Sequence, residues 1–448
     1  MGEPESGRTL TQRSECEHDE DRLDVAIRGG TVYVGSRFVE TDVGIRGNRI
    51  ERVGRIESAR EEIDASGCFV IPGLVNVHTH TPMTLLRGLA DGFPVRRWFR
   101  KEIQPVEERM TAEDVYNGAR LAIAEMLLSG TTAFGEMYFE EEAILRAVAE
   151  SGIRARVGYG MSNEEKTREE SEAQFGQAKR FVTHVRDAFT PRVTPMITPH
   201  ATYTCDDWFL KRAAEVANTL DCPIHIHLSE SKEDALDTIE RHGIRPVEHL
   251  DRVGFWDANA YVAHAVHLDP SEIEILAEED VGVAHCPGAN MKLRSGFCPV
   301  SELREAGVSV SLATDGPASN NSLDMLEEMK LATLLSRCRL GTVDVESRTI
   351  LDMATRVGAD ILDVEAGRIE PGFRADIAIL DGEVSSLVPV NDPVSNIVYS
   401  ANREAVRTVL VGGDILVSER ELVPFDEDEV YDAARKSSQR IADGRELA

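Results

Sequence analysis

Residues 72–80 read Pro-Gly-Leu-Val-Asn-Val-His-Thr-His, an apolar run that ends in two histidines one residue apart. Side chains two positions apart on a strand point to the same side, so His78 and His80 could face one point and bind one metal ion. An H-x-H pair does not establish such a site by itself. One core histidine and one surface histidine would give the same pattern, so further evidence for a metal site has to come from the rest of the chain.

Further apolar segments follow this run and alternate with amphipathic segments of helical period. A helix is expected to begin after Thr111, with Glu113 and Asp114 in its first turn and Gly130 just past its end. Eight strands that alternate with helices predict a parallel sheet, closed as an α/β barrel of the (β/α)8 type. The eight candidate strands span residues 69–77, 131–135, 153–159, 192–198, 222–228, 260–264, 281–285 and 308–314.

The two ends of the chain differ from its middle in their pattern of apolar and polar residues. Residues 23–72 alternate apolar and polar side chains between glycine-containing turns, which predicts antiparallel hairpins, and residues 371–425 show the same pattern. We expect these two ends to form one small β-sandwich domain beside a metal-dependent barrel made of residues 73–370. The polar, acidic residues 1–22 predict a disordered tail, and residues 426–448 a C-terminal helix or tail.

Catalytic residues of such barrels lie at the C-terminal ends of the strands. The fifth candidate strand is followed by Glu230, and the eighth ends in Thr314-Asp315-Gly316. His225 and His227 share a face of the fifth strand, so the pattern does not say which of them is a ligand. Six of the twelve histidines lie at predicted strand ends: His78, His80, His200, His225, His227 and His264.

Three imidazoles and one carboxylate suit a divalent cation such as Zn²⁺, with Fe²⁺ or Mn²⁺ as alternatives. A cation of this kind lowers the pKa of a bound water toward about 7. The acid–base chemistry then needs a carboxyl group beside that water, and Glu230 fits this need.

Seven stretches of sequence carry the strand-end motifs: PGLVNVHTHTPMTLLRGLADGFPVRRWF (72–99), SGTTAFGEMYF (129–139), TPHATYTC (198–205), IHIHLSE (224–230), AHAVHL (263–268), HCPGANMKLRSG (285–296) and LATDGPASNNSLDM (312–325). They resemble the amidohydrolase superfamily and, more narrowly, its 5-methylthioadenosine/S-adenosylhomocysteine deaminase family. The resemblance covers about residues 23–425. The triazine chlorohydrolases, guanine deaminases and cytosine deaminases have closely similar motifs, so the substrate is less firmly indicated than the superfamily.

The family resemblance implies a distorted (β/α)8 barrel with a β-sandwich built from both chain ends. It also implies a metal-dependent hydrolytic deaminase of a small-molecule nucleoside, giving an inosine-type product and ammonia. The substrate would be S-adenosylhomocysteine, methylthioadenosine, 5′-deoxyadenosine or adenosine. Members of the superfamily often self-associate, so a homo-oligomer fits the resemblance.

Matching motif to motif, the resemblance implies one divalent metal per subunit and favours His227 over His225. Binuclear members carry a carboxylated lysine near the end of the fourth strand, whereas residues 193–200 (VTPMITPH) contain no lysine. The implied metal ligands are His78, His80, His227 and Asp315.

The same matching assigns the remaining roles. Glu230 would carry a proton to the ring nitrogen, His264 would hold and polarise the attacking hydroxide, and Asp315 would assist as a base. Glu107 matches a position that binds the ribose hydroxyls, although it could also pair locally. His200 matches a histidine that contacts the substrate.

Several positions leave alternatives open. His285 either acts in the site or braces a loop, and Trp98 either lines the pocket or packs the loop. Tyr159 stands where some methylthioadenosine-specific members have arginine, and Ala289 and Glu136 replace a serine and an aspartate. These departures spare the expected metal ligands but leave the contacts to the 5′ substituent undecided.

Two other readings of the function compete with deamination of a nucleoside. One is another hydrolase of the same group, such as a chlorotriazine hydrolase or a deaminase of a free base, for which a ribose-binding acid at Glu107 has no use. The other is a catalytically inactive structural protein with this fold. Inactive members lose the metal ligands, whereas all of the implied ligands are present in this sequence.

The composition limits the partners. The 448 residues include 49 Lys and Arg against 79 Asp and Glu, a formal net charge of −30, and only 8 of the 49 are Lys, which leaves 41 Arg. Phosphate backbones and anionic membranes would repel such a chain, so we expect neither nucleic acid nor membrane as a partner. A surface rich in acid and poor in lysine resembles cytosolic proteins of salt-loving archaea, which predicts stabilisation by molar KCl.

The cysteines indicate a reducing compartment. There are seven, an odd number, and none forms a C-x-x-C pair. No apolar run approaches the roughly 18 residues of a membrane span, and residues 1–22 lack the apolar segment of a signal peptide. We therefore expect a cytoplasmic protein.

Overall fold

The computed structural model describes residues 22–340 and 345–443, so the tail expected at 1–22 lies, except for Arg22, outside the described residues. One eight-stranded sheet forms the barrel, and its strands are neighbours in chain order and parallel. This order confirms the predicted alternation of strands and helices. The strands are β6 (Leu74–Thr79), β7 (Thr131–Tyr138), β8 (Arg154–Met161), β9 (Val193–Pro199), β10 (Ile224–Leu228), β11 (Ala260–His264), β12 (Gly282–His285) and β13 (Val310–Leu312).

The first predicted strand, 69–77, is wrong as a single element. It is divided into β5 (Cys68–Pro72), which belongs to the other sheet, and β6, which opens the barrel. The break falls at Gly73, where a Cβ atom would lie 2.1 Å from the Thr132 hydroxyl oxygen. β5 pairs antiparallel with β14 (Ile377–Asp381), a partner three hundred residues away that local sequence does not reveal.

The barrel closes through side chains and strand ends. No backbone ladder joins β13 to β6 within the described ranges. The amide of Asn76 instead donates to the Thr314 hydroxyl (2.7 Å) and accepts from the Thr314 N–H (3.0 Å). The next residue, Asp315, donates its N–H to the His78 carbonyl (3.1 Å). This closure sets the first and last strand ends side by side.

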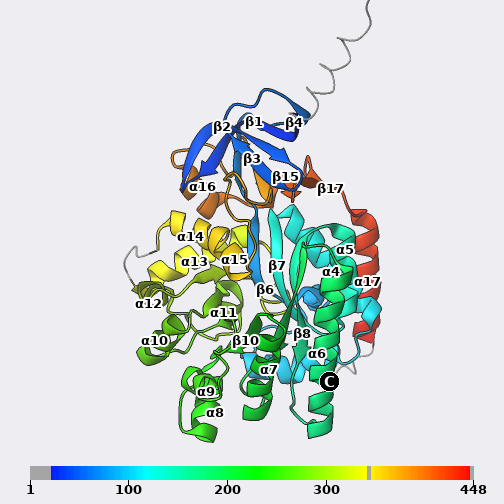
Figure 1. The fold of residues 1–448 in the computed structure, drawn as a ribbon, viewed down its shortest axis with the longest axis vertical. Helices are drawn as coiled ribbons and strands as arrows, with labels where there is room; N and C mark the ends of the chain where they lie inside the picture. Colours follow the sequence, from blue (N-terminus) through cyan, green and yellow to red (C-terminus); the bar gives the residue numbers. More distant parts are fainter. Residues whose placement is uncertain (1–21, 341–344, 444–448) are drawn as a thin grey trace, which may run out of the picture.

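Both chain ends contribute to the second, nine-stranded sheet, which Figure 1 shows above the barrel. The expected antiparallel hairpins form at both chain ends, in β1–β2–β3 and in β15–β16–β17, but β1 also pairs in parallel with β4 and β5. One buried apolar cluster draws on strands from both ends of the chain, so the sheet curves around a common interior. Its other strands are β1 (Leu23–Val34), β2 (Arg37–Arg46), β3 (Arg49–Val53), β4 (Ala59–Asp64), β15 (Val406–Val411), β16 (Asp414–Ser418) and β17 (Glu421–Leu422).

Helix α4 (Ala112–Leu128) begins where the sequence predicts. Thr111 and Asp114 form a reciprocal capping box, which satisfies N–H groups that the first helical turn leaves free. Asp114 also binds Arg440 of the C-terminal helix α17 (Glu427–Asp443), which lies along α4 (Figure 1).

The remaining helices surround the barrel or cross its ends. They are η1 (Thr81–Leu86), α2 (Val95–Arg97), η2 (Trp98–Ile103), α3 (Gln104–Glu107), α5 (Glu141–Ser151), α6 (Arg168–Ala188), α7 (Asp207–Thr219), α8 (Lys232–His242), α9 (Pro246–Arg252), α10 (Pro270–Glu278), α11 (Pro287–Lys292), α12 (Val300–Glu305), α13 (Met325–Leu340), α14 (Ser347–Met353), α15 (Arg356–Ile361), α16 (Pro393–Ser400) and η3 (Arg403–Ala405).

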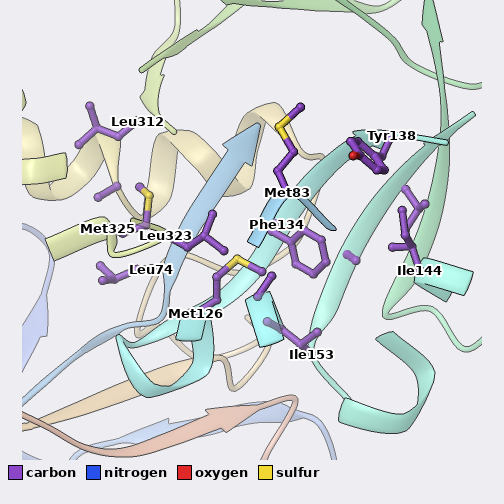
Figure 2. Close-up of a cluster of buried hydrophobic side chains, with 14 of the residues drawn as sticks. Leu74, Met83, Met126, Phe134, Tyr138, Ile144, Ile153, Leu312, Leu323 and Met325 are labelled. Atoms are coloured by element: carbon purple, nitrogen blue, oxygen red, sulfur yellow. The ribbon is translucent and has the colours of Figure 1, made fainter. Parts of the chain in front are cut away.

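The main apolar core lies between the barrel strands and these helices. Figure 2 shows Phe134 of β7 and Met126 of α4 within one cluster, and both are fully buried. Burying a side chain of this size stabilises the fold by about 1.5–3 kcal/mol. None of the described helices is long and apolar enough to cross a membrane. The core thus holds the strand ends, and the polar groups on them, in fixed positions.

Candidate active site

A cavity of about 340 Å³ opens at the C-terminal ends of the barrel strands. His80, His227, His264 and Asp315 line it together with Glu230, although they come from four separate parts of the sequence. All of them except His227 are buried, and His227 is half-buried. The fold therefore brings together the residues that the sequence places at strand ends.

His80 and His227 both bond to backbone carbonyls through Nδ1. His80 donates to the carbonyl of Met137, and His227 to that of His200 at 2.8 Å. A carbonyl can only accept, so the proton must lie on Nδ1 and the lone pair on Nε2. The two Nε2 atoms lie 3.3 Å apart, where two lone pairs cannot form a hydrogen bond with each other.

His225 orients His78 through a chain of two bonds. His225 Nδ1 lies 2.9 Å from the carbonyl of Tyr261, and its Nε2 lies 2.8 Å from His78 Nδ1. The carbonyl fixes the proton on His225 Nδ1, so His225 Nε2 accepts from His78 and leaves the lone pair of His78 on Nε2. That buried Nε2 atom has no hydrogen-bond partner among the described residues.

Asp315 completes this cluster. Its Oδ1 lies 3.4 Å from His78 Nε2 and 3.2 Å from His80 Nε2, while Ser319 donates to its Oδ2 (2.6 Å). Asp315 has a positive φ of 62°, a strained backbone for a residue other than glycine that is characteristic of functional sites.

The donor set fits a single divalent cation. Zinc–nitrogen bonds of about 2.0–2.1 Å in a tetrahedron place neighbouring ligands roughly 3.3 Å apart. The distances of 3.2, 3.3 and 3.4 Å between the atoms that face the cluster agree with this spacing. His264 also lies within reach, in one group with His78 and His227.

Glu230 lies at the edge of the same cluster. Ser295 donates to its Oε1 (3.0 Å), and its Oε2 lies 3.9 Å from His264 Nε2. Burial raises the pKa of Glu230 to about 7, so this carboxyl can hold or release a proton near neutrality. His264 Nδ1 lies 3.0 Å from the side-chain oxygen of Asn290, which directs its other nitrogen into the cavity.

The wall of the cavity carries the other expected contacts. Glu107 is buried, accepts a hydrogen bond from the Tyr138 hydroxyl (2.6 Å), and has a pKa raised by that burial. His200 stacks on Phe99 with ring centroids 5.4 Å apart. Trp98 also lines this cavity.

His285 is not among the residues that line this cavity, and it lines a separate small cavity with Cys298 and Ser301.

The comparisons with known proteins agree with this geometry. Residues 69–416 match the profile of the amidohydrolase family. This chain belongs to the amidohydrolase family.

Curated relatives extend over nearly the whole chain. A Halobacterium salinarum protein named 5-methylthioadenosine/S-adenosylhomocysteine deaminase is 40% identical over 413 residues, which cover 92% of this chain and 95% of the relative. A Methanosarcina mazei protein named 5′-deoxyadenosine deaminase is 41% identical, over 93% of this chain and 94% of its own.

Solved structures show the same architecture. An adenosine deaminase from Xanthomonas campestris with bound zinc superposes with a TM-score of 0.90 at 33% identity, covering 94% of this chain and 99% of its own. A triazine hydrolase variant shares the fold, with a TM-score of 0.86 at 23% identity over 93% of this chain and all of its own.

In this amidohydrolase, four residues support the site in a way that was not predicted: Asn290, Ser295 and Ser319 were not singled out from the sequence, and His225 was weighed only as a possible metal ligand. His225, Asn290, Ser295 and Ser319 each bond to a residue expected in the site. All four lie inside the motifs quoted for the resemblance, which is the signal that could have found them. His267 is half-buried and bonds to the Ser295 carbonyl (2.6 Å), so it supports the loop that carries Ser295.

Glu136 supports the loop after β6, the first strand of the barrel. Its carboxylate accepts bonds from the Thr81 N–H (2.9 Å) and the Thr79 hydroxyl (3.1 Å). These bonds hold the backbone on both sides of His80. The change from aspartate to glutamate noted in the sequence therefore keeps a carboxylate in a bracing position.

Proposed function

We propose that this amidohydrolase is a hydrolytic deaminase that converts an adenine nucleoside to an inosine-type nucleoside and ammonia. The observation that carries the proposal is the buried Glu230, which lies beside His264 at the edge of the His and Asp cluster. The names of the curated relatives, which are deaminases of adenine nucleosides, support it.

The residues suited to hold the metal are His78, His80, His227 and Asp315. We propose one divalent cation per subunit, Zn²⁺ in the first place, with Fe²⁺ or Mn²⁺ as alternatives. When bound, such a cation makes water a good nucleophile at neutral pH. The zinc in the solved adenosine deaminase structure supports this choice.

The reaction adds water to C6 of the adenine ring and breaks the bond from C6 to the amino group. Glu230 takes a proton from the water and delivers it to the neighbouring ring nitrogen, which its pKa of about 7 permits. His264 orients the water through Nε2 and stabilises the charge that develops on its oxygen. Asp315 accepts the remaining proton of the attacking water and passes it to the amino group, which leaves as ammonia.

The cavity wall would hold the rest of the nucleoside. One oxygen of Glu107 is engaged by Tyr138, and its carboxylate can accept further bonds from two ribose hydroxyls. The stacked His200 and Phe99 offer a flat surface beside the base. A free base or a chlorotriazine has no ribose hydroxyls for Glu107 to bind, which favours a nucleoside.

A panel of substrates tests the proposal. Ammonia release would be measured for methylthioadenosine, S-adenosylhomocysteine, 5′-deoxyadenosine, adenosine, guanine and cytosine, and chloride release for a chlorotriazine. We expect turnover of adenine nucleosides. Turnover of only a free base or the triazine would favour another hydrolase of this group, and a metal-free protein inactive on every compound would favour a structural role.

Replacement of Glu230 tests the assigned chemistry. Glu230→Gln should retain bound metal and lose at least about 10²-fold in kcat, because the amide cannot shuttle a proton. Glu233→Gln, an exposed carboxyl at the start of α8, is the matched control and should behave as wild type. Near-normal turnover in Glu230→Gln would remove this residue from the mechanism.

We also propose a cytoplasmic location. Among the described residues, Cys68, Cys205, Cys222, Cys286 and Cys338 form no disulfide bond, which suits a reducing compartment. A small-molecule substrate is the partner that the cavity and the relatives support. The acidic composition and the Halobacterium relative support an origin in a salt-loving archaeon.

A further inference from the structure

A further group of metal-binding side chains lies outside the active-site cavity. Among the residues that the structure describes, three groups of His and Asp side chains bring their donor atoms within 4.8 Å of one another, and two of these groups belong to the active site. The third consists of Asp207, His242 and His249. None of its members lines the active-site cavity, so this group is a separate feature of the molecule.

Three helices on the outside of the barrel supply these side chains. Asp207 is the first residue of α7, His242 is the last residue of α8, and His249 lies within α9. Figure 1 shows α7, α8 and α9 at the lower edge of the molecule. The exposed fraction of the side chain falls from 51% for Asp207 through 22% for His242 to 1% for His249. The group is therefore anchored on its inner side and open to solvent on its outer side.

The donor atoms of the three side chains face one another. Asp207 Oδ1 lies 2.9 Å from His249 Nε2 and 3.6 Å from His242 Nδ1. Bonds of about 2.0–2.2 Å from zinc to nitrogen and oxygen place neighbouring ligands roughly 2.9–3.4 Å apart. The first distance lies in this range. The imidazole rings of His242 and His249 stack with centroids 3.9 Å apart, and a small rotation of the half-buried His242 ring brings the second distance into the range as well.

His249 can bind a cation through Nε2 without losing a second hydrogen bond. A carboxylate only accepts, so His249 donates its Nε2 proton to Asp207 in the structure. Its buried Nδ1 atom has no hydrogen-bond partner among the described residues. When Nε2 binds a cation, the proton of the neutral ring moves to Nδ1, where no existing bond has to be broken. Asp207 then changes from hydrogen-bond acceptor to metal ligand.

The donor types decide which class of ligand fits this group. Two imidazoles and one carboxylate suit divalent transition-metal cations such as Zn²⁺, whereas Ca²⁺ and Mg²⁺ prefer ligands that are all oxygen. An anion would meet the carboxylate of Asp207 as a like charge. Three protein donors leave further positions of the cation to water, which the exposed Asp207 admits.

We propose that Asp207, His242 and His249 bind a second divalent transition-metal cation, in addition to the catalytic one, and that this cation ties α7, α8 and α9 together. The active site offers four donor side chains, all buried or half-buried. It should therefore fill first, and the second site should bind more weakly. The inference does not depend on the proposed deaminase activity, because a cation at the second site contacts no residue of the active-site cavity and should leave kcat unchanged.

Zinc titration of the full chain tests the second site. Competition with a chromogenic chelator measures how many zinc ions each subunit binds and how tightly. We expect two per subunit in the wild type, with the second affinity weakened at least about tenfold in His242→Ala and in Asp207→Asn. The amide in Asp207→Asn still accepts the bond from His249 but is a poor zinc ligand, so this variant separates metal binding from structural support.

His184→Ala is the matched control. It also removes an exposed histidine beside a carboxylate, 3.3 Å from Glu142, but this pair has no second histidine within reach in the described groups, so both zinc affinities should stay as in wild type. The second zinc should also raise the unfolding temperature of the wild type more than that of His242→Ala or Asp207→Asn. A wild type that binds one zinc only, or a second affinity unchanged in both variants, would overturn this inference and leave the deaminase assignment standing.

Discussion

Each histidine at the centre of the site is held through the ring nitrogen that faces away from the cluster. The partner of that nitrogen is a backbone carbonyl for His80 and His227 but a second histidine for His78. The sequence alone did not show whether His225 or His227 is the metal ligand, because side chains two positions apart lie on the same face of β10. In the fold the two differ at Nε2: that of His225 lies 2.8 Å from His78 Nδ1, whereas that of His227 lies 3.3 Å from His80 Nε2 inside the cluster.

Replacing His225 tests this arrangement at the scale of one residue. His225→Phe removes the acceptor for His78 Nδ1, so we expect zinc affinity to fall about 10- to 100-fold. His225→Gln, whose amide oxygen can accept the same bond, should lose less. Zinc affinity is measured by competition with a chromogenic chelator, after circular dichroism has shown that each variant is folded. Equal affinity in His225→Phe and wild type would show that His78 needs no such partner.

Local signals predicted some elements well and others poorly. Thr111 and Asp114 gave the start of α4 because a capping box is contained within four residues. The break at Gly73 between β5 and β6 was missed because it depends on pairing with β14, far along the chain. The parallel pairing of β1 with β4 and β5 was missed for the same reason.

The cap of α4 has a measurable energetic effect. Thr111→Ala removes the side chain that accepts the Asp114 N–H and should lower the free energy of unfolding by about 1 kcal/mol. Thr111→Ser keeps the hydroxyl and should remain close to wild type. Urea unfolding at constant KCl measures both. Equal losses in the two variants would show that the hydroxyl makes no contribution.

Glu328 of α13 makes stability depend on pH. It is buried and accepts from Asn320 (2.8 Å) and from the Gly288 N–H (3.1 Å), yet burial dominates and raises its pKa from 4.5 to about 8. The folded state therefore binds more protons than the unfolded state between these values, and stability from this group falls as pH rises through that window.

Glu328→Gln imitates the protonated carboxyl and should remove this dependence. We expect the variant to gain stability relative to wild type as the pH rises from about 5 to about 8. Glu327→Gln, the exposed neighbour on the same helix, is the control and should change little. Urea unfolding at several pH values measures the difference, and a pH-independent difference would contradict the raised pKa.

The whole molecule carries a net charge of −30, and its acidic residues far outnumber those of the site. Surface ion pairs are individually weak, so screening of the overall repulsion should outweigh their loss in salt. We expect the unfolding temperature to rise from dilute buffer to molar KCl, and uncharged sucrose serves as a control for solvent effects. An unfolding temperature as high in dilute buffer as in KCl would contradict this account.

At the scale of the whole molecule, the sequence predicted the order of the eight barrel strands and the joining of both chain ends in one β domain. The order follows from the alternation of strand and helix patterns, which is local. The closure of the barrel through Asn76 and Thr314 could not be predicted, because it joins side chains at opposite ends of the barrel sequence. That closure is what places Asp315 beside His78.

Stepwise return of zinc to the metal-free protein, with ammonia release from S-adenosylhomocysteine or methylthioadenosine measured at each step, tests most directly whether this is a single-metal nucleoside deaminase. We predict a rate that rises in proportion to bound zinc and levels off at one equivalent per subunit. Turnover without metal, a rate that continues to rise to a second equivalent, or a zinc-loaded protein that releases no ammonia would contradict it.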